Sequence, residues 1–301
     1  MRLINNTNYF KSLNSTKMKT FKLLFVAIII SVGFTSCTSE ENDPIIVEEN
    51  PLIDYNVVSN IKANAHSIEI YSEEKEFLIG YNELFIRIKD EATKSYLSNA
   101  EISWMPVMHM TEMMHSCPKS EVSATENASV YKGFAIFQMP GNANEYWNLT
   151  LEYSIDGQTY EATERIEVKT PADDKRRVNV FMGSDDTRYI LAMMPMQPKV
   201  AVNDFSAMLF KMENMMTFPV VENYIVTIDP RMPSMGNHSS PNNMDLSYDA
   251  TSEMYKGKLS LTMTGYWKIN LKLMNESDEV LNGEDITEEN EDSSLFFEIE
   301  F

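Results

Sequence analysis

The stretch WNLTLEYSIDGQTYEATERIEV, residues 147–168, decides the fold class. Its two runs, Trp147–Ser154 and Thr159–Val168, are rich in β-branched and aromatic residues and often alternate apolar with polar side chains, which is typical of strands. Asp156-Gly157 lies between the runs, and Asp-Gly is a strong signal for a tight hairpin turn. The stretch therefore predicts a pair of antiparallel strands.

The same strand pattern extends toward the N-terminus. Further short strands are predicted at Ser67–Tyr71, Glu83–Lys89, Glu101–Trp104 and Val130–Gln138. No long window shows the 3.6-residue period of a helix, so the chain is predicted to be all-β.

The second half of the chain repeats landmarks of the first half in the same order. Asn82 and Asn203 each stand at the start of an apolar strand. The other matched pairs are Tyr131-Lys132-Gly133 with Tyr255-Lys256-Gly257, Met139 with Met263, and Tyr146-Trp147 with Tyr266-Trp267. This ordered series indicates an internal duplication. Two all-β copies predict two tandem immunoglobulin-like antiparallel β-sandwiches, at residues 52–170 and 171–301, divided at the polar segment Thr170–Arg177.

Composition excludes some classes of function. The formal charge of −20 repels nucleic acid and anionic lipid headgroups, so nucleic-acid binding is not expected. The sequence has no nucleophile elbow, phosphate-binding glycine loop or His-Glu-x-x-His motif, and we therefore do not expect an enzyme. The 22 methionines are the unusual feature, and many of them are clustered.

The N-terminus has the pattern of an export signal. A basic region precedes the apolar run Leu23–Phe34, which is too short to span a bilayer comfortably, so residues 1–36 are interpreted as a signal peptide, with Met18 as an alternative start. The run ends at Cys37 in a sequence that resembles the looser lipobox of Bacteroidetes lipoproteins, which implies lipidation of Cys37. Residues 37–51 are acidic and predict a flexible tether. We expect a lipid anchor in the outer membrane, on its periplasmic face or at the cell surface.

Two methionine-rich segments predict a site for a soft metal. MPVMHMTEMMHSCP (105–118) and MPSMGNHSSP (232–241) both open with Met-Pro-x-Met and close with His-Ser-x-Pro. Thioether and imidazole form a donor set that Cu(I) selects. Because Pro106 is expected to break the strand, a loop rather than a strand is predicted to gather Met105 and Met108 with His115 or His109. Met139 and Met263 end the following strands and are expected to complete each site.

Each half resembles the FixH/YtkA-like family of small extracytoplasmic immunoglobulin-like sandwiches. The motifs that carry the resemblance are Gly80-x-Asn82, MPVM with a following His, VYKGFAIFQM (130–139) and Tyr146-Trp147, and then Val202-Asn203, MPSMGNH, MYKGKLSLTM (254–263) and Tyr266-Trp267. Members are associated with copper handling and with assembly of copper-containing oxidases, so the resemblance implies bound copper and a protein partner for its transfer. It implies Met105, Met108 and His115 as metal positions in the first half, and Met232, Met235 and His238 in the second. His109 directly follows Met108 and stays an alternative ligand.

An interaction module is the alternative function. Methionine also fills cores and coats adaptable protein-binding surfaces, and Met208 and Met215 are expected in such places. The methionine loops would then grip a protein or glycan at the cell surface. His66 is expected at the surface, and Cys117, the lone thiol beyond Cys37, is expected to be buried or bound.

Overall fold

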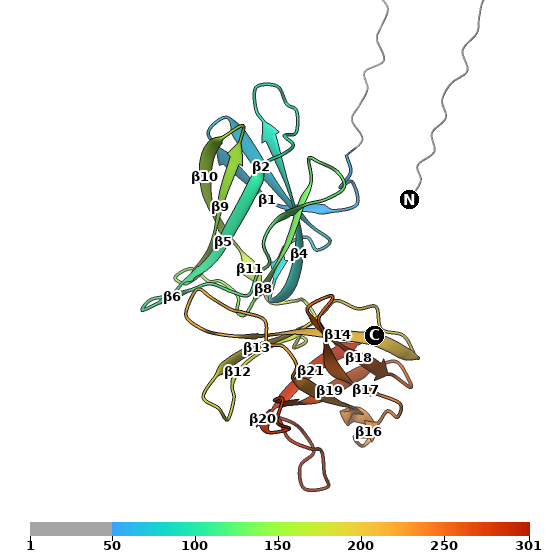
Figure 1. The fold of residues 1–301 in the computed structure, drawn as a ribbon. Coiled ribbons are helices and arrows are strands. Elements are labelled where there is room, and N and C mark those ends of the chain that lie inside the picture. Colours follow the sequence, from blue (N-terminus) through green and yellow to red (C-terminus); the bar gives the residue numbers. More distant parts are fainter. Residues whose placement is uncertain (1–49) are drawn as a thin grey trace, which may run out of the picture. The chain divides into compact units, whose positions relative to one another are not determined.

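The computed structural model describes residues 50–301, and these form almost entirely β-structure (Figure 1). Within this range there is no α-helix, and the helical structure is limited to the three-residue 3-10 turn η1, Pro233–Met235. The all-β prediction is confirmed. No helix among residues 50–301 is long and apolar enough to cross a membrane. The predicted signal peptide, the start at Met18, the lipidation site Cys37 and nearly all of the tether lie outside the described residues.

The first sandwich comprises two antiparallel sheets, drawn from blue to yellow-green in Figure 1. One sheet has the order β1-β2-β4-β8-β7, and the other has the order β10-β9-β5-β6. The bounds are β1 Asn56–Ala63, β2 His66–Ser72, β4 Gly80–Asp90, β5 Glu101–His109, β6 Met114–His115, β7 Ser123–Ala124, β8 Tyr131–Phe137, β9 Tyr146–Ile155 and β10 Gln158–Ile166. A short parallel pair, β3 Phe77–Leu78 with β11 Val168–Lys169, closes one end.

Alternation along each strand builds the core of the first sandwich. On β9, Trp147, Leu149, Leu151 and Tyr153 are buried, while the residues between them are partly or fully exposed. Burying one such large apolar side chain stabilises the fold by about 1.5–3 kcal/mol relative to leaving it in water. His66 corrects one expectation, because it is 7% exposed and its Nδ1 lies 3.1 Å from the Tyr153 hydroxyl.

The second sandwich has a similar strand plan, but its two layers belong to one continuous sheet. Its strands are β12 Val178–Met182, β13 Arg188–Met193, β14 Val202–Lys211, β15 Ile225–Met232, β16 His238–Ser239, β17 Met244–Asp249, β18 Met254–Ser260, β19 Tyr266–Met274, β20 Val280–Asn282 and β21 Leu295–Glu300. They form one continuous sheet in the order β12-β13-β14-β18-β17-β15-β19-β20, with β16 on β15 and β21 on β19. The layers are joined because β17 pairs with both β18 and β15.

Two side-chain contacts recur in equivalent places and reflect the repeated sequence. The Asn82 side chain bonds both the N–H and the carbonyl of the residue four positions earlier, and Asn203 does the same. The Tyr131 hydroxyl accepts a backbone N–H just before β5 at 2.7 Å, and the Tyr255 hydroxyl accepts one just before β15 at 3.2 Å. These residues hold strand ends in place, so their repetition is explained by folding alone.

The two sandwiches share a small apolar cluster. Ile136 of β8 packs with Ile190, Ala192, Met208 and Phe210 of β13 and β14. A backbone hydrogen bond from the Ser116 N–H to the Met215 carbonyl, 2.8 Å long, adds a polar contact. Residues 50–301 therefore belong to one compact unit, and Met208 lies in an interface as expected.

Candidate metal-binding corners

Strand β5 does not break at Pro106, which corrects the predicted loop. The strand runs from Glu101 to His109 and pairs with β9 along its whole length. Its alternation continues through the proline, so Met105 is exposed and Met108 is fully buried. The two methionines point to opposite faces of the sheet, so the prediction that a loop gathers them is wrong.

The backbone around Pro106 explains why proline is tolerated inside this strand. The Pro106 carbonyl accepts the Ser116 hydroxyl at 2.7 Å, so the polar backbone groups of Pro106 point away from β9. A proline whose nitrogen faces the open side of a strand removes no ladder hydrogen bond. Pro230 in β15 is arranged in the same way, because its carbonyl accepts the Ser240 N–H at 3.4 Å.

The buried face of β5 brings together a set of residues that we call the first corner: Met108, His115, Met139 and Trp147. Met108 pairs with Trp147 across β9 and with His115 across β6, and directly paired residues share one face of a sheet. The His115 ring meets the Trp147 ring edge-on at 5.5 Å. Trp147 Nε1 donates to the backbone carbonyl of Met139 at 3.0 Å, which places the Met139 backbone beside the same tryptophan, and the partly buried Met139 packs against the same core.

His115 is oriented as a metal ligand would be. Its Nδ1 lies 2.8 Å from the Ser116 carbonyl oxygen. A carbonyl only accepts hydrogen bonds, so Nδ1 carries the proton of the neutral ring and the lone pair is on Nε2. A backbone carbonyl that fixes the tautomer in this way is the usual second partner of a ligating histidine.

The other predicted donors of the first segment lie elsewhere. Met105 and His109 are on the outer face of the sheet, where the Met105 sulfur accepts the Ser116 hydroxyl at 3.4 Å. The His109 ring stacks on Tyr146 at 5.1 Å, and its Nε2 lies 3.2 Å from the Asn148 amide nitrogen. An amide N–H donates, so it occupies the Nε2 lone pair of His109. Of the two candidate histidines, His115 is the better placed ligand.

Equivalent residues in the second sandwich form the second corner: Met232, His238, Met263 and Trp267. Met232 pairs with His238 across β16, and the pairing of Arg231 with Lys268 places Met232 beside Trp267 on the buried face. Trp267 Nε1 donates to the Met263 carbonyl at 3.0 Å, as in the first corner. Met232 is buried in the core, whereas His238 is exposed.

The structure also corrects the alignment of the two methionine segments. Met108 and Met232 are equivalent, with Pro106 and Pro230 two residues before them, so Met232 does not correspond to Met105. Met235 projects from η1 and is 56% exposed. The sequence held a signal for this register, because Pro-x-Met stands at the same distance before Tyr-Lys-Gly in both halves.

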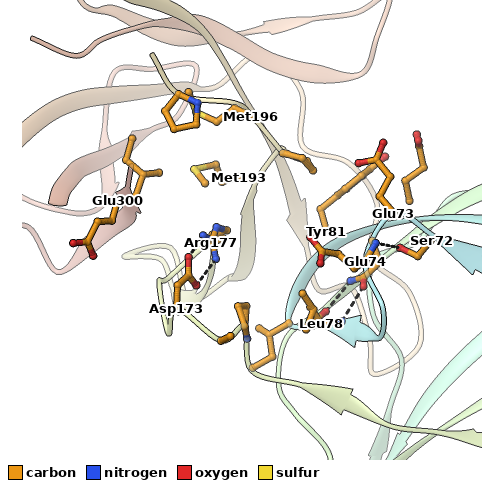
Figure 2. Close-up of a pocket in the computed structure, with 18 residues that line it drawn as sticks. Ser72, Glu73, Glu74, Leu78, Tyr81, Asp173, Arg177, Met193, Met196 and Glu300 are labelled. Atoms are coloured by element: carbon orange, nitrogen blue, oxygen red, sulfur yellow. Dashed lines mark hydrogen bonds and ion pairs between the residues drawn. The ribbon is translucent and has the colours of Figure 1, made fainter. Parts of the chain in front are cut away.

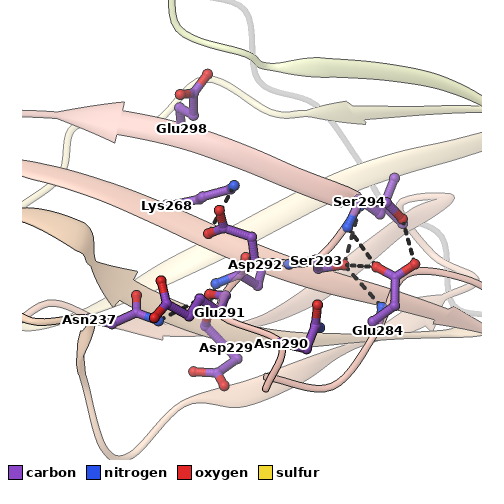
Figure 3. A network of polar contacts seen from close by, with 12 residues as sticks. Asp229, Asn237, Lys268, Glu284, Asn290, Glu291, Asp292, Ser293, Ser294 and Glu298 are labelled. Carbon is purple, nitrogen blue, oxygen red and sulfur yellow. Dashed lines mark hydrogen bonds and ion pairs between the residues drawn. The ribbon is translucent and has the colours of Figure 1, made fainter. Parts of the chain in front are cut away.

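A polar network holds the loop of the second corner, as Figure 3 shows. Arg231 binds the Asp229 carboxylate at 2.7 and 2.8 Å, and the Asn237 amide donates to the Glu291 carbonyl at 3.0 Å. Glu284 accepts the backbone N–H of Ser294 at 2.6 Å together with serine hydroxyls, and these hydrogen bonds lower the pKa of its carboxyl group. These acidic side chains fasten strands and loops and do not form a metal site.

Cys117 lies next to the first corner but has no exposed thiol. The residue is 1% exposed, and burial raises the pKa of its thiol far above the usual range. It therefore behaves as a small core residue, and of the two expected states, buried or bound, the structure shows the buried one. Among residues 50–301, no group of three or more His, Cys, Asp or Glu side chains is arranged to hold a metal ion.

A second candidate site is an open cleft of about 470 Å³, shown in Figure 2. Leu78 and Tyr81 line it from the first sandwich, and Met193 and Met196 line it from the second. Arg177 is the one basic residue of the lining and is paired with Asp173, while four further acidic residues make the lining net acidic: Glu73, Glu74, Glu83 and Glu300. Burial, with a nearby glutamate, raises the pKa of Tyr81 to about 12, so this phenol stays neutral and can donate a hydrogen bond. Sequence reasoning did not find this cleft, because its walls come from distant segments.

Comparisons with known proteins give no family for this chain. No family model matches it, and no curated protein matches. One similar solved structure is FdeC, an Escherichia coli adhesin, with a TM-score of 0.24 and 12% identity over 75% of this chain. Another is a DUF4785 family protein from Legionella pneumophila, with a TM-score of 0.24 and 8% identity over 72% of this chain. The matches span 65% and 55% of those chains, less than two thirds of each, and similarity at this level bears on neither family nor function.

Proposed function

We propose that this tandem immunoglobulin-like protein binds Cu(I) as cargo at its first corner, and more weakly at its second. The observation that carries the proposal is the ladder pairing of Met108 with both His115 and Trp147, because it sets thioether and imidazole on one face beside an aromatic ring. The recurrence of the set in the second sandwich supports it. Within the envelope location that the sequence predicts, such a protein would carry or buffer copper for a partner protein.

The residues of the first corner fit a soft monovalent ion. Methionine sulfur stays unprotonated at any pH and forms no disulfides, so it suits a site outside the cytoplasm. Met108 and Met139 supply thioethers, and His115 supplies the Nε2 lone pair that its bond to the Ser116 carbonyl leaves in place. A cation held against the face of Trp147 would gain about 0.5–2 kcal/mol from the ring.

The two corners are expected to differ in affinity. His115 is partly buried against Trp147, so its ring loses little freedom when it binds an ion. His238 is exposed and has to be ordered first, which costs about 0.5–1.5 kcal/mol of side-chain entropy. We therefore expect the first corner to fill before the second.

A Cu(I) titration of the full chain tests the proposal. The protein is titrated without oxygen against a chromophoric Cu(I) chelator, while tryptophan fluorescence reports on Trp147 and Trp267. We expect submicromolar binding that quenches the fluorescence and is weakened at least tenfold in His115→Ala. His109→Ala is the matched control, because its ring lies on the outer face, and it should bind as the unmodified protein does. Affinity no tighter than micromolar, or equal losses in both variants, would refute the proposal.

An interaction module is the second candidate, and the cleft of Figure 2 favours it. Its walls combine methionine and tyrosine surfaces with an excess of carboxylates over the single Arg177 guanidinium, which suits a peptide or glycan that carries a basic group. Binding of that kind would not change when copper is chelated. An array of glycans and peptides probed with the protein and with the variant Glu73→Gln with Glu74→Gln distinguishes the two candidates, since retention that depends on these carboxylates and ignores chelator supports the module.

A further inference from the structure

Two exposed Met-Met pairs lie in two turn regions that meet: Met113-Met114 at the end of one turn and the start of β6, and Met215-Met216 in another turn. Met113-Met114 closes the turn between β5 and β6, where the Met110 N–H donates to the Met113 carbonyl at 2.9 Å. Met215-Met216 occupies the centre of a turn in the second sandwich, between Asn214 and Thr217, which form a β-bridge.

A backbone hydrogen bond connects the two turn regions. The Ser116 N–H, two residues after Met114, donates to the Met215 carbonyl at 2.8 Å. The four side chains Met113, Met114, Met215 and Met216 therefore come from two sandwiches but stand on either side of one hydrogen bond. We call them the methionine cluster.

The fold does not need methionine at these positions. The four side chains are 47, 50, 45 and 39% exposed, in sequence order. Met215 and Met216 occupy a turn centre, where Gly, Asn, Asp and Ser are favoured, and an exposed apolar side chain adds no core stability there or at Met113 and Met114. Since neither turn geometry nor packing accounts for these two pairs, their shared thioether chemistry is the property that remains.

The surroundings of the methionine cluster favour a cation. Glu112 directly precedes Met113-Met114, and Glu213 lies two residues before Met215-Met216. Both glutamates are exposed. Thioether sulfur selects a soft monovalent ion over a hard divalent one. The nearby carboxylates add a general attraction for cations.

We propose that the methionine cluster is a second soft-metal site, which takes Cu(I) or Ag(I) on thioether sulfurs from both sandwiches at once. The site is separate from both corners, since it shares no residue with them and lies on exposed turns. A ligand set drawn from two sandwiches requires that each pair contribute. Removing either pair should then abolish tight binding, whereas two independent sites would each survive loss of the other.

Silver nitrate is the probe of choice, because Ag(I) is soft and monovalent and stays in one oxidation state without a reductant. The full chain is labelled with ¹³C at the methionine ε-methyl groups and titrated with Ag(I), and the methyl signals are followed by NMR. The variants are Met113→Leu with Met114→Leu, and Met215→Leu with Met216→Leu. Leucine keeps the apolar volume but lacks sulfur. Met182→Leu with Met244→Leu is the matched control, because both residues are exposed methionines outside the cluster.

We expect one equivalent of Ag(I) to shift the four methyl signals of the cluster together. Each paired leucine variant should lose this equivalent, with affinity reduced at least tenfold, while the control variant keeps it. Quenching of Trp147 and Trp267 by metal at the corners should stay intact in every variant, so failure of this proposal is distinguishable from failure of the corner proposal. An unchanged stoichiometry in either paired variant, or shifts spread over all exposed methionines, would overturn the bridging site.

Discussion

Replacing Met108 separates its two roles, core packing and metal binding. Met108 is fully buried in the first core, so Met108→Ala removes a side chain that the surrounding sheet cannot replace. Truncations of this kind cost about 2–5 kcal/mol, from lost transfer energy and from the cavity left behind. Met108→Leu keeps nearly the same volume and should cost less than about 1.5 kcal/mol. We therefore expect the leucine variant to fold and to lack only the sulfur.

Any difference in Cu(I) affinity between Met108→Leu and the unmodified protein then reports on the missing sulfur. Met108 pairs directly with His115, so the ion would lose one of its few ligands in the leucine variant. We expect Cu(I) affinity to fall about 100-fold, which corresponds to about 2.8 kcal/mol. The assay pairs urea denaturation with an oxygen-free competition titration against a Cu(I) chelator.

Two results would contradict this reasoning. A leucine variant that holds Cu(I) as tightly as the unmodified protein would remove Met108 from the site. An alanine variant that costs less than about 1 kcal/mol would show that the side chain is not packed as described. Met235→Leu is the control, because Met235 is exposed on η1 and belongs to neither corner.

Three further predictions concern the framework of the corners. Gly265→Ala should destabilise the protein by about 1–3 kcal/mol in urea denaturation, because Gly265 has a φ of 122° and an added Cβ would lie 3.1 Å from the Met232 side chain. Gly157→Ala is the control and should cost less, because Gly157 also has a positive φ but an added Cβ would meet nothing within 4 Å. Cys117 should resist thiol reagents in the folded protein and react once denaturant unfolds it, because its thiol is buried and its pKa is raised; rapid labelling without denaturant would show that the corner opens. The hydrogen bond from the Ser294 N–H lowers the pKa of Glu284, so its contribution to stability is present above the ordinary carboxyl pKa of 4.5 and is lost as the pH falls through the lower folded value; denaturation midpoints measured between pH 7 and about pH 3 should therefore fall less steeply in Glu284→Gln than in the unmodified protein.

The strand pattern and the duplication could be read from the sequence. Period-2 alternation decides which face of a strand is buried, and this information is local, so Trp147–Ser154 and Glu83–Lys89 were placed correctly. The recurring Asn82 and Asn203 also act locally, since each side chain bonds the residue four positions earlier. Properties that depend on a few neighbouring residues can be predicted without knowledge of the fold.

The composition of the sites was decided by the tertiary structure. Proline is disfavoured within a strand, but Pro106 lies where its nitrogen faces an open edge, and only the pairing of β5 with β9 reveals this. That pairing turns Met105 outward and Met108 inward, and it selects His115 over His109. Likewise, the meeting of Met113-Met114 with Met215-Met216 depends on a hydrogen bond between segments about 100 residues apart. The sequence by itself determined which side chains of each strand are buried, because alternation is a local property. Which residues they meet across the sheet depends on strand register and on contact between the sandwiches, and both are set by packing over the whole chain.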